Sequence, residues 1–334
     1  MSNRNFSAQR LIRRFILISL GLTLIQPVIA QPTYPSKPIR ILAGIAPGGT
    51  VDTIARLYAT HMSDILKVPV IVENKPGAFQ IPAIRTLTNS QPDGYTLFLA
   101  NGSSVSLTPA FQKDLPYDPL KDFSFVARTA NTPAVFIVSN DVPATTLQEL
   151  IAYSKENPDT LNYGSAGMGT ASNLKIEYIK SFSGLNATHI PYKSDAEVLQ
   201  ELTAGRIHFS MTTLQSAVPA LKTGLARALG VSSFETNEQL PGVPGTKLIG
   251  IPELESVEPY SFYGFVAPAG VSDDVKKKLN EVINQISEMP SVKNQILNTF
   301  YMTPISESPE DFRQFTQREL NKSLKLAKIL EPAQ

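Results

Sequence analysis

Short apolar segments alternate with amphipathic helical stretches along most of this chain. Strand candidates cover residues 39–43, 68–72, 97–100 and 136–138, and helical stretches begin at Asp52 and Leu147. This order predicts an α/β protein with mainly parallel sheets, because parallel neighbours are joined by helical crossovers that cover the sheet. With 334 residues, of which 42% are hydrophobic, the chain can bury two cores.

The N-terminus has the pattern of a bacterial secretory signal. Four arginines precede the apolar run 15–25, and the small-residue segment Val28-Ile29-Ala30 follows it. As a membrane span the run would be short, and Gln26-Pro27 interrupts it. We therefore expect residues 1–30 to be a signal peptide that is cleaved after Ala30, and we expect a periplasmic location.

Charge and cysteine content exclude several classes of function. Cleavage after Ala30 would leave 304 residues with 26 basic and 29 acidic side chains, a net charge of −3. This weak charge argues against a nucleic-acid partner. The chain has no cysteine, which excludes disulfides, thiolate catalysis, covalent haem attachment and a lipoprotein anchor.

Two glycine turns each lie between a strand candidate and a helix candidate. The first contains Ala46, Pro47, Gly48 and Gly49, with Asp52 in the helical stretch that follows. The first turn of a helix leaves backbone N–H groups without partners and carries the positive end of the helix dipole. The turn therefore predicts a cradle for a carboxylate or phosphate, with Asp52 as a turn or capping residue.

The second cradle follows the short strand that contains Leu161 and Tyr163. It is formed by Ser165, Ala166, Gly167 and Thr170. Neither cradle contains arginine or lysine, so an anion there would be held by N–H dipoles and by hydroxyl groups. The candidate hydroxyls are those of Thr50, Ser165, Thr170 and Ser172.

Two extended segments could carry the chain between two lobes. They cover residues 125–138, with an expected interruption at Thr132-Pro133, and residues 260–268. We expect lobe 1 to contain residues 31–130 and 254–334, and lobe 2 to contain residues 131–253. The two cradles would then face each other across a cleft that closes by hinge motion.

The chain resembles the extracytoplasmic solute-binding receptors of tripartite tricarboxylate transporters, also called Bug receptors. The resemblance spans the chain after the signal and rests on the order and spacing of several motifs. They include Tyr34-Pro35-Ser36-Lys37-Pro38, Pro47-Gly48-Gly49, Val72-Glu73-Asn74-Lys75-Pro76-Gly77-Ala78, Pro92-Asp93-Gly94-Tyr95-Thr96-Leu97, Gly167-Met168-Gly169-Thr170, His189-Ile190-Pro191-Tyr192-Lys193 and Ala267-Pro268-Ala269-Gly270.

The resemblance implies a type II periplasmic-binding-protein fold, with two lobes joined by two crossing strands and a ligand cleft between them. It also implies a receptor without catalytic residues, metal or cofactor, which delivers a small carboxylate to membrane transporter subunits and acts as a monomer. The ligand could be a dicarboxylate, an amino acid or an aromatic acid. Besides the two cradles, the resemblance suggests that the loop Gly77-Ala78-Phe79 forms another wall, with further ligand contacts in the segment Asn101 to Ser103 and at Tyr192 and Asp195.

The chain departs from the family pattern at four positions near the expected cleft. Phe79 stands where further glycine is usual, and the other departures are Asn173, Ser194 and Phe262. Phe79 could face the cleft and reduce its volume, or it could pack beneath its own loop. These departures leave the identity of the ligand open.

Rival functions have weaker support in the sequence. The first glycine turn lacks both the phosphate-loop ending and the three-glycine dinucleotide pattern. His61, His189 and His208 lie in different elements, and no nucleophile elbow precedes a helix, so a periplasmic hydrolase is disfavoured. We expect His189 to be a strand-end residue. A receptor of the same fold that presents its ligand to a sensor kinase stays open as an alternative.

Overall fold

The computed structural model describes residues 34–256 and 260–330. From Lys37 onward, the described residues form one compact unit. The expected signal peptide, residues 1–30, lies outside the described residues. Within the described ranges, no helix combines the length and the apolar character that a membrane span requires.

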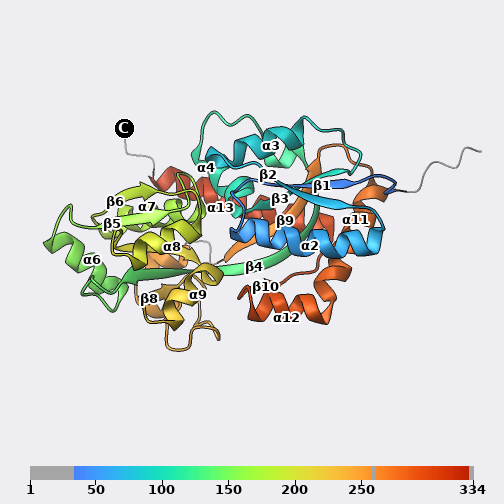
Figure 1. The fold of residues 1–334 in the computed structure, drawn as a ribbon. Coiled ribbons are helices and arrows are strands. Elements are labelled where there is room, and N and C mark those ends of the chain that lie inside the picture. Colours follow the sequence, from blue (N-terminus) through green and yellow to red (C-terminus); the bar gives the residue numbers. More distant parts are fainter. Residues whose placement is uncertain (1–33, 257–259, 331–334) are drawn as a thin grey trace, which may run out of the picture. The chain divides into compact units, whose positions relative to one another are not determined.

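The first part of the chain builds parallel strands with helices between them (Figure 1). Strand β1 lies between β2 and β3 and pairs with both in parallel. The elements are β1 (Ile39–Ala43), α2 (Thr50–Leu66), β2 (Val70–Asn74), α3 (Ile81–Thr88) and β3 (Thr96–Asn101), followed by the short helices α4 (Thr108–Phe111) and α5 (Pro119–Asp122). The expected alternation of strand and helix is confirmed here.

A second group of parallel strands follows in the middle of the chain. Strand β5 pairs in parallel with β6 and β7. The elements are α6 (Leu147–Glu156), β5 (Asn162–Ser165), α7 (Ala171–Ser183), β6 (Thr188–Pro191), α8 (Asp195–Thr203), β7 (Phe209–Thr213), α9 (Leu214–Lys222), β8 (Ala226–Val231) and the short α10 (Thr246–Ile249). Side-chain hydroxyls cap several of these helices, including Thr146 before α6 and Thr170 before α7.

The long strand β4 (Phe123–Ser139) connects the groups and β9 (Tyr260–Pro268) begins at their junction, so the complete sheet is mixed. Strand β4 pairs antiparallel with β9 over its first part and with β7 and β8 over its second part. Figure 1 shows β4 as the long strand that runs between the two groups. The strand order is β2-β1-β3-β9-β4-β7-β5-β6.

The expected interruption of the first crossing at Thr132-Pro133 is wrong, because β4 is continuous through both residues. Pro133 lies opposite Tyr260 of β9, and the next residue, Ala134, lies opposite Thr213 of β7. Proline lacks an N–H donor for the ladder. It is tolerated in β4 at the position where the strand exchanges one neighbour for another.

The C-terminal elements reach both groups of strands. They are α11 (Asp273–Glu288), α12 (Pro290–Asn298), the two-residue β10 (Thr303–Pro304) and α13 (Pro309–Leu330). Phe312 of α13 belongs to the core beside β3 and β9, whereas Leu326 of the same helix packs against the core beside β5 and β7. Helix α13 therefore spans the junction of the two groups.

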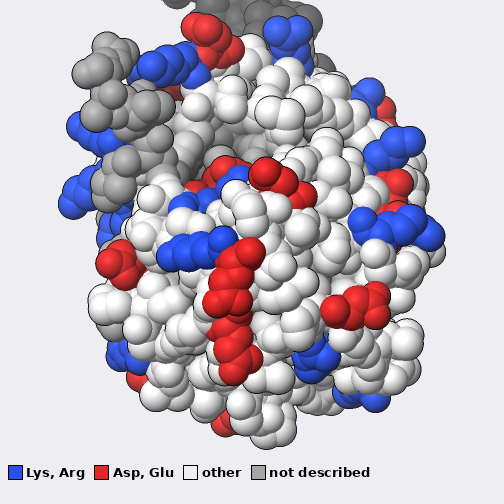
Figure 2. Space-filling view, turned by 90° about the vertical axis from the view of Figure 1, so that its left-hand side faces the viewer, with Lys and Arg blue, Asp and Glu red and all other residues white. Residues whose placement is uncertain are grey.

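Each group of strands has its own apolar core. The core beside β3 and β9 includes Phe98, Phe262 and Phe312, and the core beside β5 and β7 includes Tyr163 and Phe209. Figure 2 views the molecule from the side of β5, β6 and α6, where positive and negative side chains are interspersed. No charge of a single sign dominates the part of this face that the structure describes.

Candidate functional site

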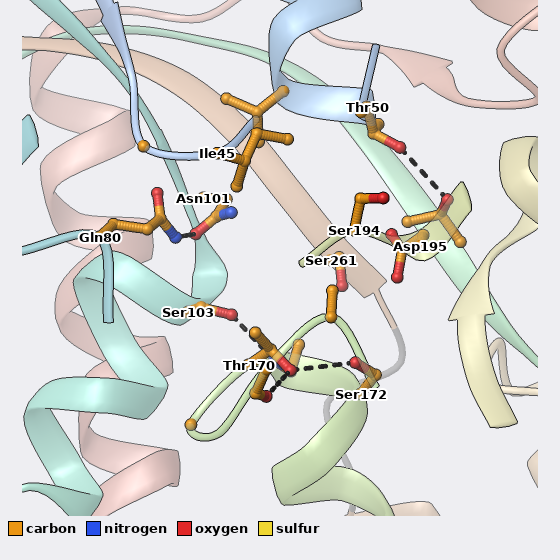
Figure 3. A pocket seen from close by; sticks show the side chains of 18 of the residues that line it. Ile45, Thr50, Gln80, Asn101, Ser103, Thr170, Ser172, Ser194, Asp195 and Ser261 are labelled. Carbon is orange, nitrogen blue, oxygen red and sulfur yellow. Dashed lines mark hydrogen bonds between the residues drawn. The ribbon is translucent and has the colours of Figure 1, made fainter. Parts of the chain in front are cut away.

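A cavity of about 610 Å³ lies where the two groups of strands meet. Its wall includes Gly49, which precedes α2, and Thr50, the first residue of α2. It also includes Gly167 and Thr170, which precede α7, and Tyr263 of strand β9. Figure 3 shows hydroxyl and amide side chains from both groups around the same space. The volume suits a small organic ligand.

The first cradle is a turn between β1 and α2. Helix α2 begins at Thr50, and the Thr53 N–H donates to the Gly49 carbonyl, so the preceding N–H groups of the first turn have no acceptor within the helix. Asp52 stabilises the turn: its carboxylate accepts from the Gly48 N–H (2.9 Å) and from the Asn74 amide (2.8 Å). The expected turn role of Asp52 is confirmed.

The ionised form of Asp52 is favoured by its partners. Burial opposes ionisation, but hydrogen bonds from Arg56, from the Gly48 N–H and from Asn74 hold the pKa of Asp52 below its usual range. The turn therefore contains a negative charge, although Asp52 is not part of the cavity wall.

The second cradle is a turn between β5 and α7. The Thr170 hydroxyl donates to the Gly167 carbonyl (2.7 Å) and accepts from the Asn173 N–H (3.4 Å), which caps α7. The Asn173 side chain accepts from the Gly169 N–H (3.0 Å) and donates to the Tyr163 hydroxyl (2.8 Å). Asn173, one of the departures from the family pattern, thus holds the turn from below.

Buried Ser165 and half-buried His189 form a pair beneath the second cradle. The Ser165 hydroxyl donates to the Gly167 carbonyl (2.9 Å), so the His189 Nε2, 2.7 Å from the same oxygen, acts as the donor to it. Ser165 is fully buried. Burial lowers the pKa of His189, which favours the neutral ring. The pair supports the loop, in agreement with the expectation that His189 is a strand-end residue.

Four contacts join the two groups of strands across the cavity. The Ala171 N–H donates to the Ser103 hydroxyl (2.9 Å), and the Thr108 hydroxyl donates to the Gly169 carbonyl (3.3 Å). The hydroxyls of Thr50 and Thr213 lie 3.4 Å apart, and Figure 3 shows this contact beside Ser194 and Asp195. In this structure the two groups of strands, which form opposite walls of the cavity, are therefore in direct contact with each other.

The fourth contact involves Phe79, which lies in the cavity wall. A Cβ atom added to Gly169 would be 2.0 Å from a carbon of the Phe79 ring. The ring therefore lies directly on the backbone of the second cradle. Of the two alternatives for Phe79, the structure places the ring at the cavity rather than beneath its own loop.

Most of the residues expected at the site line the cavity, and four do not. Those in the wall are Gly49, Gly77, Ala78, Phe79, Asn101, Gly102, Ser103, Ala166, Gly167, Thr170, Tyr192 and Asp195. Pro47 and Gly48 are exposed at the tip of their turn, with the half-buried Ala46 beside them, and Ser165 is buried beneath its turn. Ala46, Pro47, Gly48 and Ser165 are therefore absent from the wall.

Several wall residues were not expected from the sequence. They are Gln80, Thr108, Lys175, Thr212, Thr213, Ser261 and Tyr263. Lys175 is 2% exposed and lies in the first half of α7, in a helical stretch whose apolar stripe indicated only core packing. Tyr263 lies on β9, where strand alternation shows which residues share a face but not which face borders a cavity.

The cavity wall has one acidic side chain among the described residues, that of Asp195, together with two lysines, Lys175 and Lys193. Burial raises the pKa of Asp195 to about 6, with a smaller opposing effect from the Thr212 hydroxyl. Burial and the nearby Asp195 carboxylate raise the pKa of Tyr263, whose hydroxyl is also hydrogen-bonded to Thr50. Among the described residues, no group of three histidine, aspartate or glutamate side chains could hold a metal ion.

A mixed sheet with two parallel groups, two crossing strands and a cavity at their junction defines a two-lobe solute-binding protein. Comparison with known proteins agrees with this class. The family model described as "Tripartite tricarboxylate transporter family receptor" matches residues 54–331. A UPF0065 protein of Bordetella pertussis is 38% identical over 293 residues, which cover 87% of this chain and 88% of that protein.

Solved structures show the same fold. MatC of Rhodopseudomonas palustris, with bound malate, superimposes with a TM-score of 0.82 at 26% identity, covering 88% of this chain and 100% of MatC. A second R. palustris protein, in a structure with adipate, gives a TM-score of 0.81 at 25% identity, covering 89% and 98% of the two chains. The chain belongs to the tripartite tricarboxylate transporter receptor family, whose members are binding receptors rather than enzymes.

Proposed function

We propose that this protein is a periplasmic receptor that captures a small organic carboxylate between its two lobes and delivers it to a tripartite tricarboxylate-type transporter. The observation that carries the proposal is the cavity bounded by two strand–turn–helix units, one from each group of strands. Helix N-termini that face a common space favour a negatively charged ligand.

The cradles would hold the carboxylate through dipoles and hydroxyl groups. The candidates are the first-turn N–H groups of α2 and α7 with the hydroxyls of Thr50, Thr170 and Ser172, all three of which are in the cavity wall. The Ser103 hydroxyl already accepts from the Ala171 N–H, so an oxygen acceptor fits against the first turn of α7. Ordered water could bridge the remaining distance at little cost.

Two similar proteins support the ligand class. MatC was solved with malate and the second R. palustris protein with adipate, and both compounds are small carboxylates. Both proteins share this fold over at least 88% of the present chain. We infer from this likeness that the cavity of the present protein also receives a carboxylate.

Capture would proceed by closure of the lobes about β4 and the start of β9. In an open form one cradle would bind the ligand first, and closure would add the second cradle and the contacts of Phe79 and Thr108 with Gly169. Exclusion of water then strengthens each dipolar contact. We place the hinge near residues 130 and 254, which are the lobe boundaries expected from the sequence.

The proposal is tested by identifying what the protein carries. The protein is purified without denaturation, and any co-purified small molecule is identified by mass spectrometry. A carboxylic acid that raises the melting temperature when it is added back would support the proposal, because a ligand that binds only the folded state stabilises it. A protein that no member of a broad organic-acid panel stabilises would contradict it.

A matched pair of variants on α7 locates the binding. Ser172 lies in the cavity wall, whereas Ser181 lies on an exposed part of the same helix. We expect Ser172→Ala to weaken binding by roughly 3- to 10-fold, the usual effect of losing one hydrogen bond. Ser181→Ala is expected to bind normally. Equal affinities of the two variants, measured by titration calorimetry, would remove Ser172 from the site.

Delivery needs a separate measurement in cells. We expect deletion of the gene to abolish uptake of the identified acid, and we expect uptake to return with the intact gene but not with a variant that cannot bind. Normal uptake in the deletion strain, together with loss of a transcriptional response to the acid, would instead assign the protein to a sensor kinase.

A further inference from the structure

Asp195 places a single acidic group in a cavity that is proposed to bind an acid. It is the first residue of α8, and Ser194 before it caps this helix. Figure 3 shows Asp195 with Ser194 and Ser261 on one side of the cavity. Among the described wall residues no other aspartate or glutamate occurs.

The groups around Asp195 come from several elements. The Thr212 hydroxyl of β7 lies close enough to lower the pKa of Asp195. Tyr263 of β9 lies close enough for the Asp195 carboxylate to raise the pKa of its phenol. The charged side chains that share the cavity with it are Lys175 of α7 and Lys193 of the loop before α8, and Tyr192 is the further titratable group.

A carboxylate in such a place favours a cationic partner. Burial of a charge is costly unless an opposite charge or hydrogen-bond donors compensate for it. Burial raises the pKa of Asp195 only to about 6, so the group is mainly ionised at neutral pH. Closure around a second carboxylate next to Asp195 would bring two like charges together in a water-poor site.

We propose that the ligand is an amino-carboxylate: its carboxylate binds at the two cradles, and its protonated amine binds the Asp195 carboxylate. This inference rests on the proposed function and narrows it. Tyr263, Ser261 and Thr212 also line the cavity, and their hydroxyl oxygens can accept the remaining hydrogen bonds of the protonated amine. Asp195 is then the residue that discriminates against dicarboxylates.

The sign of the pH dependence separates the two ligand classes. Protonation of Asp195 removes the partner of an amine, so the affinity for an amino-carboxylate falls as the pH drops through about 6. A protonated Asp195 can donate to a second carboxylate, so the affinity for a dicarboxylate rises over the same interval. His189, hydrogen-bonded to Ser165 beneath the second cradle, also takes up a proton as the pH falls, and its positive charge favours any carboxylate ligand; comparison of the unchanged protein with Asp195→Asn isolates the part of the slope that belongs to Asp195.

The experiment is a calorimetric titration of the purified protein with matched pairs of acids that differ only in the amine. Suitable pairs are glutamate with glutarate and 2-aminopentanoate with pentanoate, at pH 7.5 and pH 5. We expect the amino member of at least one pair to bind more than roughly 10-fold tighter at pH 7.5. We expect this preference to shrink at pH 5.

Asp195→Asn is the critical variant and Asp274→Asn, on an exposed part of α11, is its control. We expect Asp195→Asn to lose the preference for the amine while it keeps or gains affinity for the plain acid, which shows that the variant is folded. Asp274→Asn is expected to bind as the unchanged protein does. An unchanged preference in Asp195→Asn would overturn the inference.

The outcomes distinguish this inference from the proposed function. Binding of glutarate, malate or adipate with no affinity for any amino acid would overturn the amino-carboxylate class and leave the carboxylate receptor intact. Absence of binding by every acid of both classes, with a folded protein, would overturn both.

Discussion

Individual residues at this site combine local strain with contacts across the cavity. Phe79 has φ +56°, a left-handed conformation that is unfavourable for a residue with a Cβ atom. Its ring is nevertheless held on the backbone of Gly169. Strained positions of this kind occur where the surrounding structure and the function require them.

We predict that Phe79 and Gly169 are energetically coupled in ligand binding. Gly169→Ala puts a Cβ atom 2.0 Å from the Phe79 ring and also strains a residue with φ +72°. It should therefore weaken binding strongly, by about 10-fold or more. In a Phe79→Ala background the clash with the ring is absent, so Gly169→Ala should reduce the affinity for the ligand less than it does in the unchanged protein.

The measurement is a double-mutant cycle on the dissociation constant, with melting temperatures to verify folding. Additive effects would show that the ring and the glycine do not contact each other when the ligand is bound.

We predict that Asp195 reduces stability in order to serve the site. Its pKa rises from 3.8 to about 6 on folding, so the folded protein holds this proton more tightly than the unfolded chain. Stability from this group is therefore lost as the pH rises from about 4 to about 6. At pH 7.5 and without ligand, Asp195→Asn should be more stable by about 1–2 kcal/mol.

Urea unfolding at pH 7.5 and pH 4.5 measures this effect. The gain should fall to roughly a third at pH 4.5, because Asp195 is then protonated in the folded protein but still largely ionised in the unfolded chain. An equal gain at both pH values would show that the ionisation of Asp195 is not its cause.

At the scale of elements, the loop between β5 and α7 is held from several directions. Ser165 and His189 support it from below, Asn173 binds the Gly169 N–H, and Ser103 and Thr108 reach it from across the cavity. A loop of small residues can thus present its backbone to a ligand without being loose. The glycines permit the turn, and the surrounding side chains determine its position.

We predict that Ser165 acts on binding through this loop. Ser165→Ala would remove the acceptor of the His189 N–H and the donor to the Gly167 carbonyl, at a cost of about 1–3 kcal/mol in the free energy of unfolding. It should also weaken ligand binding, although Ser165 lies outside the cavity wall.

Chemical denaturation and calorimetry measure the two effects. The control is Ser63→Ala on α2, which also removes a hydroxyl that bonds to backbone but is remote from the second cradle. A loss of stability without a loss of affinity would limit Ser165 to a structural role.

The sequence predicted the positions of the helices and strands around the site better than it predicted which of their residues line the cavity. Strand and helix periodicity located β1, α2, β9 and α11, because these elements bury one face or stripe. The same periodicity assigned the stretch with Lys175 to core packing, since it does not show which part of a helix borders a cavity. Pro133 predicted an interruption that the change of strand partner makes unnecessary.

At the scale of the molecule, the fold links the two groups of strands in three places. Strand β4 passes continuously from one to the other, β9 begins at the junction, and α13 contacts both cores. The cavity lies at this junction, so relative motion of the lobes would open and close it. The arrangement accounts for a ligand site built from segments that are more than a hundred residues apart.

The most direct test of the central claim is a crystal structure of the protein with its co-purified or best-binding acid. We predict that a ligand carboxylate lies in the cavity within hydrogen-bond distance, directly or through one water, of first-turn N–H groups of both α2 and α7. A ligand bound elsewhere, or one whose carboxylate is held by a lysine without contact to either cradle, would contradict the account.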